Sequence, residues 1–248
     1  MSGSLKSRAD VLLVERGLFD SRAKAQAAIA AGLVTADGRV VKKPSDMLLA
    51  SAVIAASAAH PWVSRGGVKL EAALETFSIP VAGRTCLDVG SSTGGFTDVL
   101  IARGAARVYA VDTGRDQMAG RLAAHPNVTL MEGTDIRTLD PTRLANTPDL
   151  AVVDVSFIPL GLVLPAVAPL MAVPSDLVVL IKPQFEVGRS RIGKNGVVKD
   201  VAAREAVCGE VAEKVRDLGW TVSGTMESPI TGGEGNVEYL LAARRIAA

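Results

Sequence analysis

Two charged residues follow apolar runs that are typical of buried strands. Lys182 comes directly after LVVLI, and Pro183 favours an extended backbone at the lysine. Asp154 ends the run LAVVD, in a strand expected to lie beside the first. Burial and neighbouring cations lower the pKa of a lysine toward neutrality, so that it can accept a proton, and a nearby carboxylate can orient it. Lys182 and Asp154 are therefore candidates for acid-base chemistry at one sheet edge.

A second cation and a second carboxylate come from distant parts of the chain. Lys69 follows two glycines at the start of a predicted helix, in WVSRGGVKLEAAL. Glu238 follows a glycine loop and lies in a predicted strand, in SPITGGEGNVEYLLA. Like the first pair, these two residues have the chemistry to hold or move a proton.

The segment CLDVGSSTGGFTDVL predicts a tight turn from a strand into a helix, because its glycines at 90, 94 and 95 let the backbone approach a ligand. A P-loop is excluded, since Phe96 stands where that motif requires lysine. The dinucleotide fingerprint is also poor, because Ser92 replaces its second glycine. Asp88 instead suits a ligand with a cationic amino group, and Asp112 could accept hydrogen bonds from a ribose diol.

The elements that must position these residues alternate between short β-branched runs and helical patterns. The runs are TCLDVG, ARVYAVD, NVTLMEG, LAVVDVS, DLVVLIK, WTVSGTMESPI and VEYLLAARR. This order predicts an α/β fold with a doubly wound, mainly parallel sheet, in which ligands bind beyond the C-terminal strand ends. Polar residues stand at those ends: Asp88, Asp112, Asp135, Asp154 and Lys182.

Residues 8–58 predict a separate small α+β unit. Ser21 is a good N-cap for a helix that ends at Gly32, and LVTADGRVV predicts two strands joined by an Asp-Gly turn. Residues 21–45 resemble the S4 RNA-binding module in their signature SR…A…I..G.V..DG..V.KPS. The resemblance implies phosphate contacts to folded RNA by Arg22, Lys24, Arg39, Lys42 and Lys43.

The larger part resembles class I, Rossmann-like methyltransferases that use S-adenosylmethionine, and DVGSSTGGFTD is closest to their FtsJ-like ribose 2′-O branch. In this resemblance Asp88, Gly90 and Gly94 shape the methionine side, Asp112 holds the ribose and Asp135 lies near the adenine. Ser91 and Phe96 are further cofactor-site candidates. The branch uses a Lys-Asp-Lys-Glu tetrad, which matches Lys69, Asp154, Lys182 and Glu238 in order and context.

Together with the S4-like part, WVSRGGVKL, KPQFEVGR and SPITGGEGNVEYL resemble the TlyA family, whose older label is hemolysin. The resemblance covers about residues 8–243 and implies 2′-O-methylation of cytidine in ribosomal RNA of the large subunit, and in some members also of the small subunit. It implies that Lys182 accepts the proton or positions the hydroxyl, with Asp154 orienting it. Lys69 would hold the ribose or a neighbouring phosphate, and Glu238 would fix the lysines or the 2′-hydroxyl. Further RNA contacts are expected from Arg65, Arg189, Arg191, Lys194 and Lys199.

Composition and charge agree with a two-part enzyme that meets a polyanion. The chain has 248 residues, 48% of them hydrophobic, and a net charge of +1. Residues 1–65 carry a net charge of +4 and the remainder −3. We expect an S4-like domain at 1–58, a linker at 59–64 and a methyltransferase domain at 65–248. Only two cysteines and the absence of a signal peptide favour the cytoplasm, and no metal site is expected. The resemblance implies ribosomal RNA in ribosomal subunits as the partner.

Two alternatives come from other functional classes. The first is a non-catalytic ribosome-binding or assembly factor, which the intact tetrad argues against because a platform does not require both lysines and both acids. The second is a pore-forming hemolysin. Residues 155–175 carry no charge, but they contain four prolines, which disfavour a membrane helix.

Overall fold

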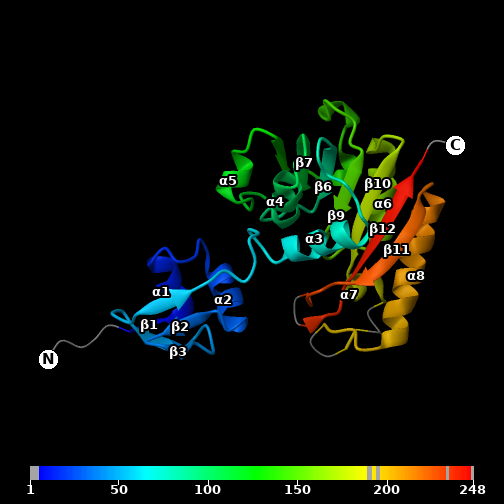
Figure 1. Cartoon of the computed structure of the whole chain (residues 1–248). Helices are drawn as coiled ribbons and strands as arrows, with labels where there is room; N and C mark the ends of the chain where they lie inside the picture. The colour runs from blue at the N-terminus through cyan, green and yellow to red at the C-terminus, as the bar shows by residue number, and fades with distance from the viewer. Residues whose placement is uncertain (1–5, 189–191, 194–195, 233–234, 247–248) are drawn as a thin grey trace. The chain divides into compact units, whose positions relative to one another are not determined.

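The computed structural model describes residues 6–188, 192–193, 196–232 and 235–246. The chain divides into two compact units, and the division falls between Ser64 and Arg65. Each unit has its own sheets and its own buried core (Figure 1). The domain limits of 1–58, 59–64 and 65–248 stay a prediction about separately folding parts.

The first unit is a small α+β structure. A three-stranded sheet has the order β3-β2-β5, and β1 pairs with β4 in a second, two-stranded sheet. Two helices cover these sheets and share a core with them. The elements are β1 Lys6–Arg8, α1 Ala9–Glu15, α2 Arg22–Ala30, β2 Val34–Ala36, β3 Arg39–Val40, β4 Met47–Leu49 and β5 Ile54–Ala56.

Local sequence accounts for the start of α2 and for the β2–β3 hairpin. The Ser21 side chain accepts a hydrogen bond from the backbone N–H of Lys24, as predicted for the N-cap. Asp37 and Gly38 both have positive φ, 50° and 75°, which is the conformation that a two-residue hairpin turn requires. The predicted helix and hairpin are confirmed.

The second unit contains a seven-stranded sheet with the order β11-β12-β10-β9-β6-β7-β8. The five strands from β10 to β8 run parallel, whereas β12 is antiparallel to both β10 and β11. The predicted doubly wound, mainly parallel sheet is therefore confirmed. The strands are β6 Thr85–Val89, β7 Arg107–Asp112, β8 Val128–Glu132, β9 Leu150–Val153, β10 Ser175–Ile181, β11 Thr221–Glu227 and β12 Tyr239–Arg245.

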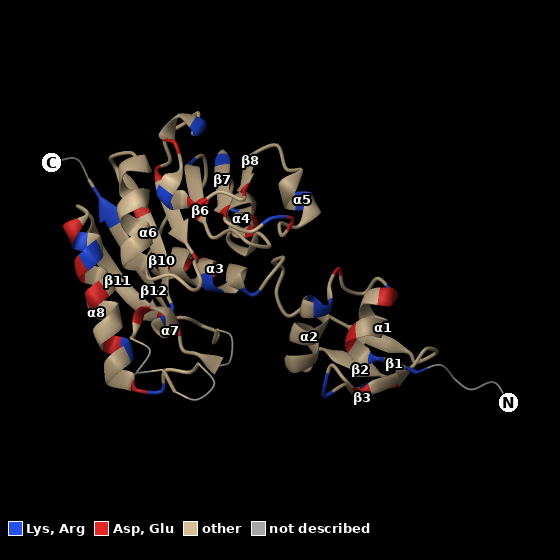
Figure 2. Cartoon of the chain, turned by 180° about the vertical axis from the view of Figure 1, so that it is seen from behind, with Lys and Arg blue, Asp and Glu red and all other residues tan. Residues whose placement is uncertain are grey.

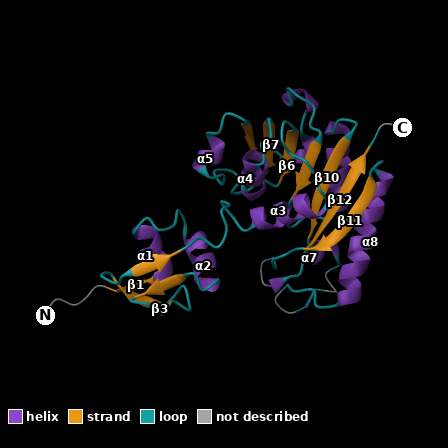
Figure 3. Cartoon of the chain, in the orientation of Figure 1, coloured by secondary structure: helices purple, strands orange, loops and turns teal. Residues whose placement is uncertain are grey.

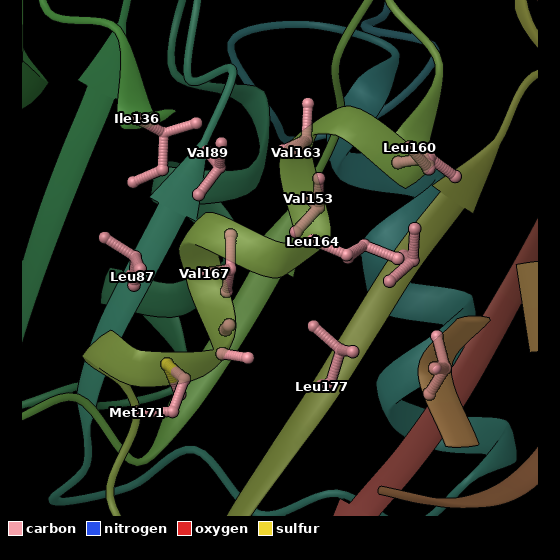
Figure 4. Packing of buried hydrophobic residues seen from close by; sticks show 14 of the residues in the cluster. Leu87, Val89, Ile136, Val153, Leu160, Val163, Leu164, Val167, Met171 and Leu177 are labelled. Atoms are coloured by element: carbon pink, nitrogen blue, oxygen red, sulfur yellow. The ribbon is translucent and has the colours of Figure 1, made fainter. Parts of the chain in front are cut away.

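Helices flank this sheet (Figure 3). On one face, alternate strand residues such as Leu87, Val153 and Leu177 pack against Leu160 and Leu164 of α6 (Figure 4). α8 contributes to the same core, while α3 and α4 contact each other, with α4 against β6 and β7 and α3 against β12. The helices are α3 Gly66–Thr76, α4 Gly95–Ala102, α5 Gly120–Ala123, α6 Leu160–Val167, α7 Pro183–Glu186 and α8 Val201–Asp217, with short 3-10 turns η1 Ile136–Thr138, η2 Pro141–Arg143 and η3 Ala168–Leu170.

The uncharged stretch 155–175 forms part of this core. It contains a loop, the eight-residue helix α6 with Pro165 inside it, and η3. Among the residues that the structure describes, no helix is long and apolar enough to cross a membrane. The stretch is thus apolar because it packs on β6, β9 and β10.

Candidate active site

Gly90 brings the ends of β6 and β9 close together. Its φ of 85° lies in the left-handed region, and a Cβ there would overlap the backbone carbonyl of Asp154. Gly94, with a φ of 94°, is the N-cap of α4, and a Cβ there would overlap the Leu122 side chain. Both glycines therefore allow a compact turn from β6 into α4.

Asp88 is completely buried at the end of β6. Its Oδ2 accepts a hydrogen bond of 2.6 Å from the Thr97 hydroxyl, while its Oδ1 has no hydrogen-bond partner among the described residues. Burial raises the pKa of this carboxyl to about 7. Asp88 thus has one buried acceptor available for a cationic or hydrogen-bonding group.

Asp112 and Asp135 follow the next two strands. Asp112 accepts backbone N–H bonds from Ser92 at 2.8 Å and Gly114 at 2.7 Å, which fastens the glycine turn to the end of β7. Asp135 caps η1 and pairs with Arg137 at 2.6 Å, and hydrogen bonds from Arg137 lower the pKa of its carboxyl. Both carboxylates are half-buried and keep part of their surface accessible.

A cavity of about 380 Å³ lies at these strand ends. Three of the predicted cofactor residues line it: Gly90, Asp112 and Asp135. The other four, Asp88, Ser91, Gly94 and Phe96, do not, and Ser91 and Phe96 are buried beside the turn. The lining also includes polar and aromatic residues that were not predicted from the sequence, among them Ser92, Gln117, Arg137, Ser156 and Phe157.

Lys182 and Asp154 form one ion pair at the ends of neighbouring parallel strands. Lys182 Nζ lies 2.6 Å from Asp154 Oδ1, and it donates a hydrogen bond of 2.8 Å to the Ser156 hydroxyl. The Lys182 and Asp154 side chains are 11% and 22% exposed, so both can be reached from the surface. Asp154 and Ser156 line the cavity, so the amine lies at its rim.

Lys69 and Glu238 form a second, more deeply buried ion pair. Lys69 Nζ donates a hydrogen bond to Glu238 Oε2, and the side chains are 10% and 3% exposed. Lys69 is in the first turn of α3, whereas Glu238 directly precedes β12 instead of lying within it as expected. A Cβ at Gly232 would overlap the Glu238 carboxylate, so only glycine leaves room for it.

Strand register brings the two pairs to the same sheet edge. Ile181 is opposite Tyr239 in the antiparallel β10–β12 ladder, so continuing the register by one residue sets Lys182 opposite Glu238. Directly opposite residues project from the same face of a sheet. Two amines and two carboxylates from four segments therefore lie at the same edge of the sheet, and Asp154 of the first pair lines the cavity. Such groups are able to orient a hydroxyl and accept its proton.

The predicted RNA-contacting residues lie in different surroundings. Arg39, Lys42 and Lys43 are exposed in and after the hairpin of the first unit, and Arg65 is exposed just before α3. Lys and Arg occur in both units (Figure 2). Arg22 is tied to the fully buried Asp10 at 2.7 Å, and Lys24 pairs with Asp20 at 3.0 Å. Arg189, Arg191 and Lys194 lie outside the described residues.

The Arg22 contact belongs to a network that holds the first unit together. Asp10 accepts hydrogen bonds from Arg8, Arg22 and Gln26. These donors, Arg8 first, hold the pKa of the Asp10 carboxyl well below its usual range. Arg22 therefore satisfies a buried charge as well as presenting a basic surface, a role that no short-range signal in the sequence indicated.

Comparison with known families assigns both parts of the chain. Residues 62–245 match the FtsJ-like methyltransferase family, and residues 7–54 match the S4 domain. The chain is 45% identical over 241 residues to the 16S/23S rRNA (cytidine-2′-O)-methyltransferase TlyA of Mycobacterium tuberculosis, covering 96% of this chain and 90% of that protein.

Two further similarities cover most of the chain. The 23S rRNA (cytidine-2′-O)-methyltransferase TlyA of Campylobacter jejuni is 36% identical over 197 residues, which cover 79% of this chain and 76% of that protein. A solved structure from Streptococcus thermophilus, which carries the hemolysin name, is 39% identical with a TM-score of 0.78. It covers 99% of this chain, and the match spans 90% of that chain.

Proposed function

The chain belongs to the FtsJ-like methyltransferase family and carries an S4 domain, and on that premise we propose that it methylates the ribose 2′-hydroxyl of a cytidine in ribosomal RNA. The observation that carries the proposal is the Lys182–Asp154 contact at the strand-end cavity, with the buried Lys69–Glu238 contact at the same sheet edge. Both relatives that are named for this reaction act on ribosomal RNA cytidine.

The residues at the cavity fit S-adenosylmethionine, which carries an ammonium group, a sulfonium and a ribose. The volume of about 380 Å³ is within the range of small-molecule sites. Asp112 and Asp135 line the cavity and would face the nucleoside. Asp88 does not line it, so its buried carboxyl would favour the cationic end by charge, without direct contact. Gly90, Ser91, Gly94 and Phe96 would shape the turn that supports it.

When bound, S-adenosylmethionine supplies a methyl group on a positively charged sulfur, and the carbon–sulfur bond breaks to leave a neutral thioether. Lys182 stands at the cavity rim and takes the hydroxyl proton, or holds the hydroxyl while that proton leaves. Asp154 holds the Lys182 amine at 2.6 Å and keeps it beside the cavity. A ribose hydroxyl is a weak acid, so a positioned base contributes about 10²-fold to 10⁴-fold to the rate.

Lys69 and Glu238 supply a fixed charge next to this base. The buried Glu238 carboxylate fixes Lys69, whose amine then binds the ribose or a neighbouring phosphate. Because Glu238 continues the register opposite Lys182, it can also face the 2′-hydroxyl. A preorganised pair of this kind needs little rearrangement during the reaction.

The S4 domain provides an additional RNA-binding surface. Its exposed Arg39, Lys42 and Lys43 would contact phosphates, and Arg22 and Lys24 would extend that surface. The first unit therefore selects a folded RNA, while Arg65 and the basic segment with Arg189 and Lys194 would bind near the reactive ribose. We infer that the partners are ribosomal subunits in the cytoplasm. Cys86 and Cys208 are both free thiols, as a reducing compartment favours.

The test is direct methylation of ribosomal particles. Purified protein would be incubated with methyl-labelled S-adenosylmethionine and separated 30S, 50S or 70S particles, and the modified nucleotide mapped. We expect label on the 2′-oxygen of a cytidine in at least one particle. Tight binding to particles without any label would instead support a non-catalytic assembly factor.

A further inference from the structure

Two groups hold the Lys182 amine, and they hold it in different ways. Asp154 Oδ1 lies 2.6 Å away, but the contact lacks hydrogen-bond alignment, and this oxygen has no hydrogen-bond partner among the described residues. Ser156 Oγ lies 2.8 Å away and accepts a hydrogen bond from the amine. Asp154 therefore contributes charge, whereas Ser156 contributes direction.

Direction matters for an amine that exchanges a proton with a hydroxyl. A lysine amine rotates freely about its last carbon–nitrogen bond, so its free electron pair has no fixed orientation without a hydrogen bond. Once one N–H is directed at Ser156, the remaining positions on the nitrogen are confined. Ser156 lines the cavity, so the constraint acts at the place where the hydroxyl must approach.

The loop that carries Ser156 is held on both sides. The next residue, Phe157, has a φ of 65°, a costly conformation for an aromatic residue, and its ring lies 4.9 Å from the Phe185 ring. The backbone N–H of Leu160 donates a 2.7 Å hydrogen bond to Glu186. The segments after β9 and β10 are thus joined at several successive points.

We propose that Ser156 is a positioning residue, which directs the Lys182 amine toward the substrate hydroxyl through the hydrogen bond between them. The inference rests on the proposed methyl transfer and deepens it. Ser156 is exposed and contributes nothing to the hydrophobic core, so its hydroxyl has no evident role in holding the fold.

The experiment compares Ser156→Ala and Ser156→Thr, because threonine keeps the hydroxyl. We expect kcat to fall by up to about 100-fold in Ser156→Ala, as for a misplaced catalytic group, and to recover largely in Ser156→Thr. The melting temperature should stay as in the unchanged protein, and the fall in kcat should persist at saturating S-adenosylmethionine. Ser223→Ala is the matched control, since Ser223 is an exposed serine on the edge strand β11.

A second readout does not depend on turnover. In protein labelled with ¹³C at lysine Cε, NMR relaxation follows the motion of the Lys182 Cε–Nζ group without cofactor, and Lys182→Arg identifies its signal. Removing the hydrogen bond to Ser156 should increase this motion in Ser156→Ala, and Ser156→Thr should restore it.

The outcomes separate this inference from the proposed function. An unchanged kcat in Ser156→Ala at saturating S-adenosylmethionine, or a loss that accompanies reduced stability, would overturn the positioning role. An unchanged motion of the Lys182 side chain would do the same. If the unchanged protein methylates no ribosomal particle, the proposed function fails, while the relaxation measurement still reports whether Ser156 holds the amine.

Discussion

The carboxylates at the strand ends differ between the two sides of the site. Toward β7, Asp88 and Asp112 have no ion pair with any Lys or Arg that the structure describes, and Asp112 accepts only backbone N–H bonds. Toward β10, Asp154 and Glu238 are each paired with a lysine. One side thus offers negative charge to a cationic ligand, and the other uses its negative charge to hold amines.

This difference separates binding from chemistry along a single sheet edge. An unpaired carboxylate gains most from a ligand that brings its own positive charge. A paired carboxylate is already satisfied, so it acts by fixing its partner. We therefore expect the first side to govern cofactor affinity and the second side to govern proton transfer.

The largest expected effect comes from Lys182. Lys182→Met should reduce methyl transfer by about 10²-fold to 10⁴-fold, because the positioned amine is removed. Calorimetry should show unchanged S-adenosylmethionine binding, since Lys182 does not line the cavity. Lys182→Arg keeps the charge but cannot give up its proton. An arginine variant with a normal rate would contradict proton acceptance and leave only hydroxyl positioning.

Breaking the more deeply buried Lys69–Glu238 pair should reduce the stability of the protein. Lys69→Met leaves the Glu238 carboxylate buried without its partner, which costs about 3–5 kcal/mol of unfolding free energy. The double variant Lys69→Met with Glu238→Gln should recover most of that loss in urea denaturation but no activity. Equal stability of the single and double variants would show that water solvates the carboxylate in the folded protein.

Asp88 should make stability depend on pH. Burial raises the pKa of its carboxyl from 3.8 to about 7, so the folded state binds the proton more tightly than the unfolded state. The contribution of Asp88 to the free energy of unfolding is therefore largest below about pH 4. It decreases as the pH rises and levels off above about pH 7. In Asp88→Asn, the melting temperature should fall less between pH 4 and pH 8 than in the unchanged protein. Saturating S-adenosylmethionine should also make this fall smaller in the unchanged protein. Asp112→Asn is the control, in which the fall with pH should remain.

The smallest expected effect is on RNA binding by the basic side chains of the first unit. Replacing Arg39, Lys42 and Lys43 with alanine should weaken RNA binding and reduce the slope of log affinity against log salt by about 0.7–0.9 for each phosphate that is no longer neutralised. Stability should not change, because these side chains are exposed. Arg22→Ala should weaken RNA binding and, unlike the triple variant, also lower the melting temperature. The reason is that it removes one hydrogen-bond donor from the buried Asp10 carboxylate. An unchanged salt slope in the triple variant would exclude this surface from RNA binding.

Local patterns were sufficient for the fold class and for several site residues. Apolar β-branched runs that end in Asp88, Asp112, Asp154 or Lys182 predicted both the strands and the polar sheet edge, because parallel strands end on the same side. The Lys182–Asp154 contact follows from the same reasoning, since neighbouring strands bring their ends together.

Long-range contacts account for what the sequence did not predict. Which carboxylate pairs with Lys69 depends on an antiparallel strand that arrives 169 residues later. The Ser156 contact depends on the backbone at Phe157, whose positive φ no pattern of residue types indicates. Asp10 and Arg22 belong to different helices, so their pairing appears only when the helices pack.

The antiparallel direction of β12 has a consequence for the timing of activity. Glu238 enters the site from the start of a strand that is held between β10 and β11, so the hairpin must form before the carboxylate is in place. The site is therefore completed only after β12 has been translated and has paired with both of its neighbours.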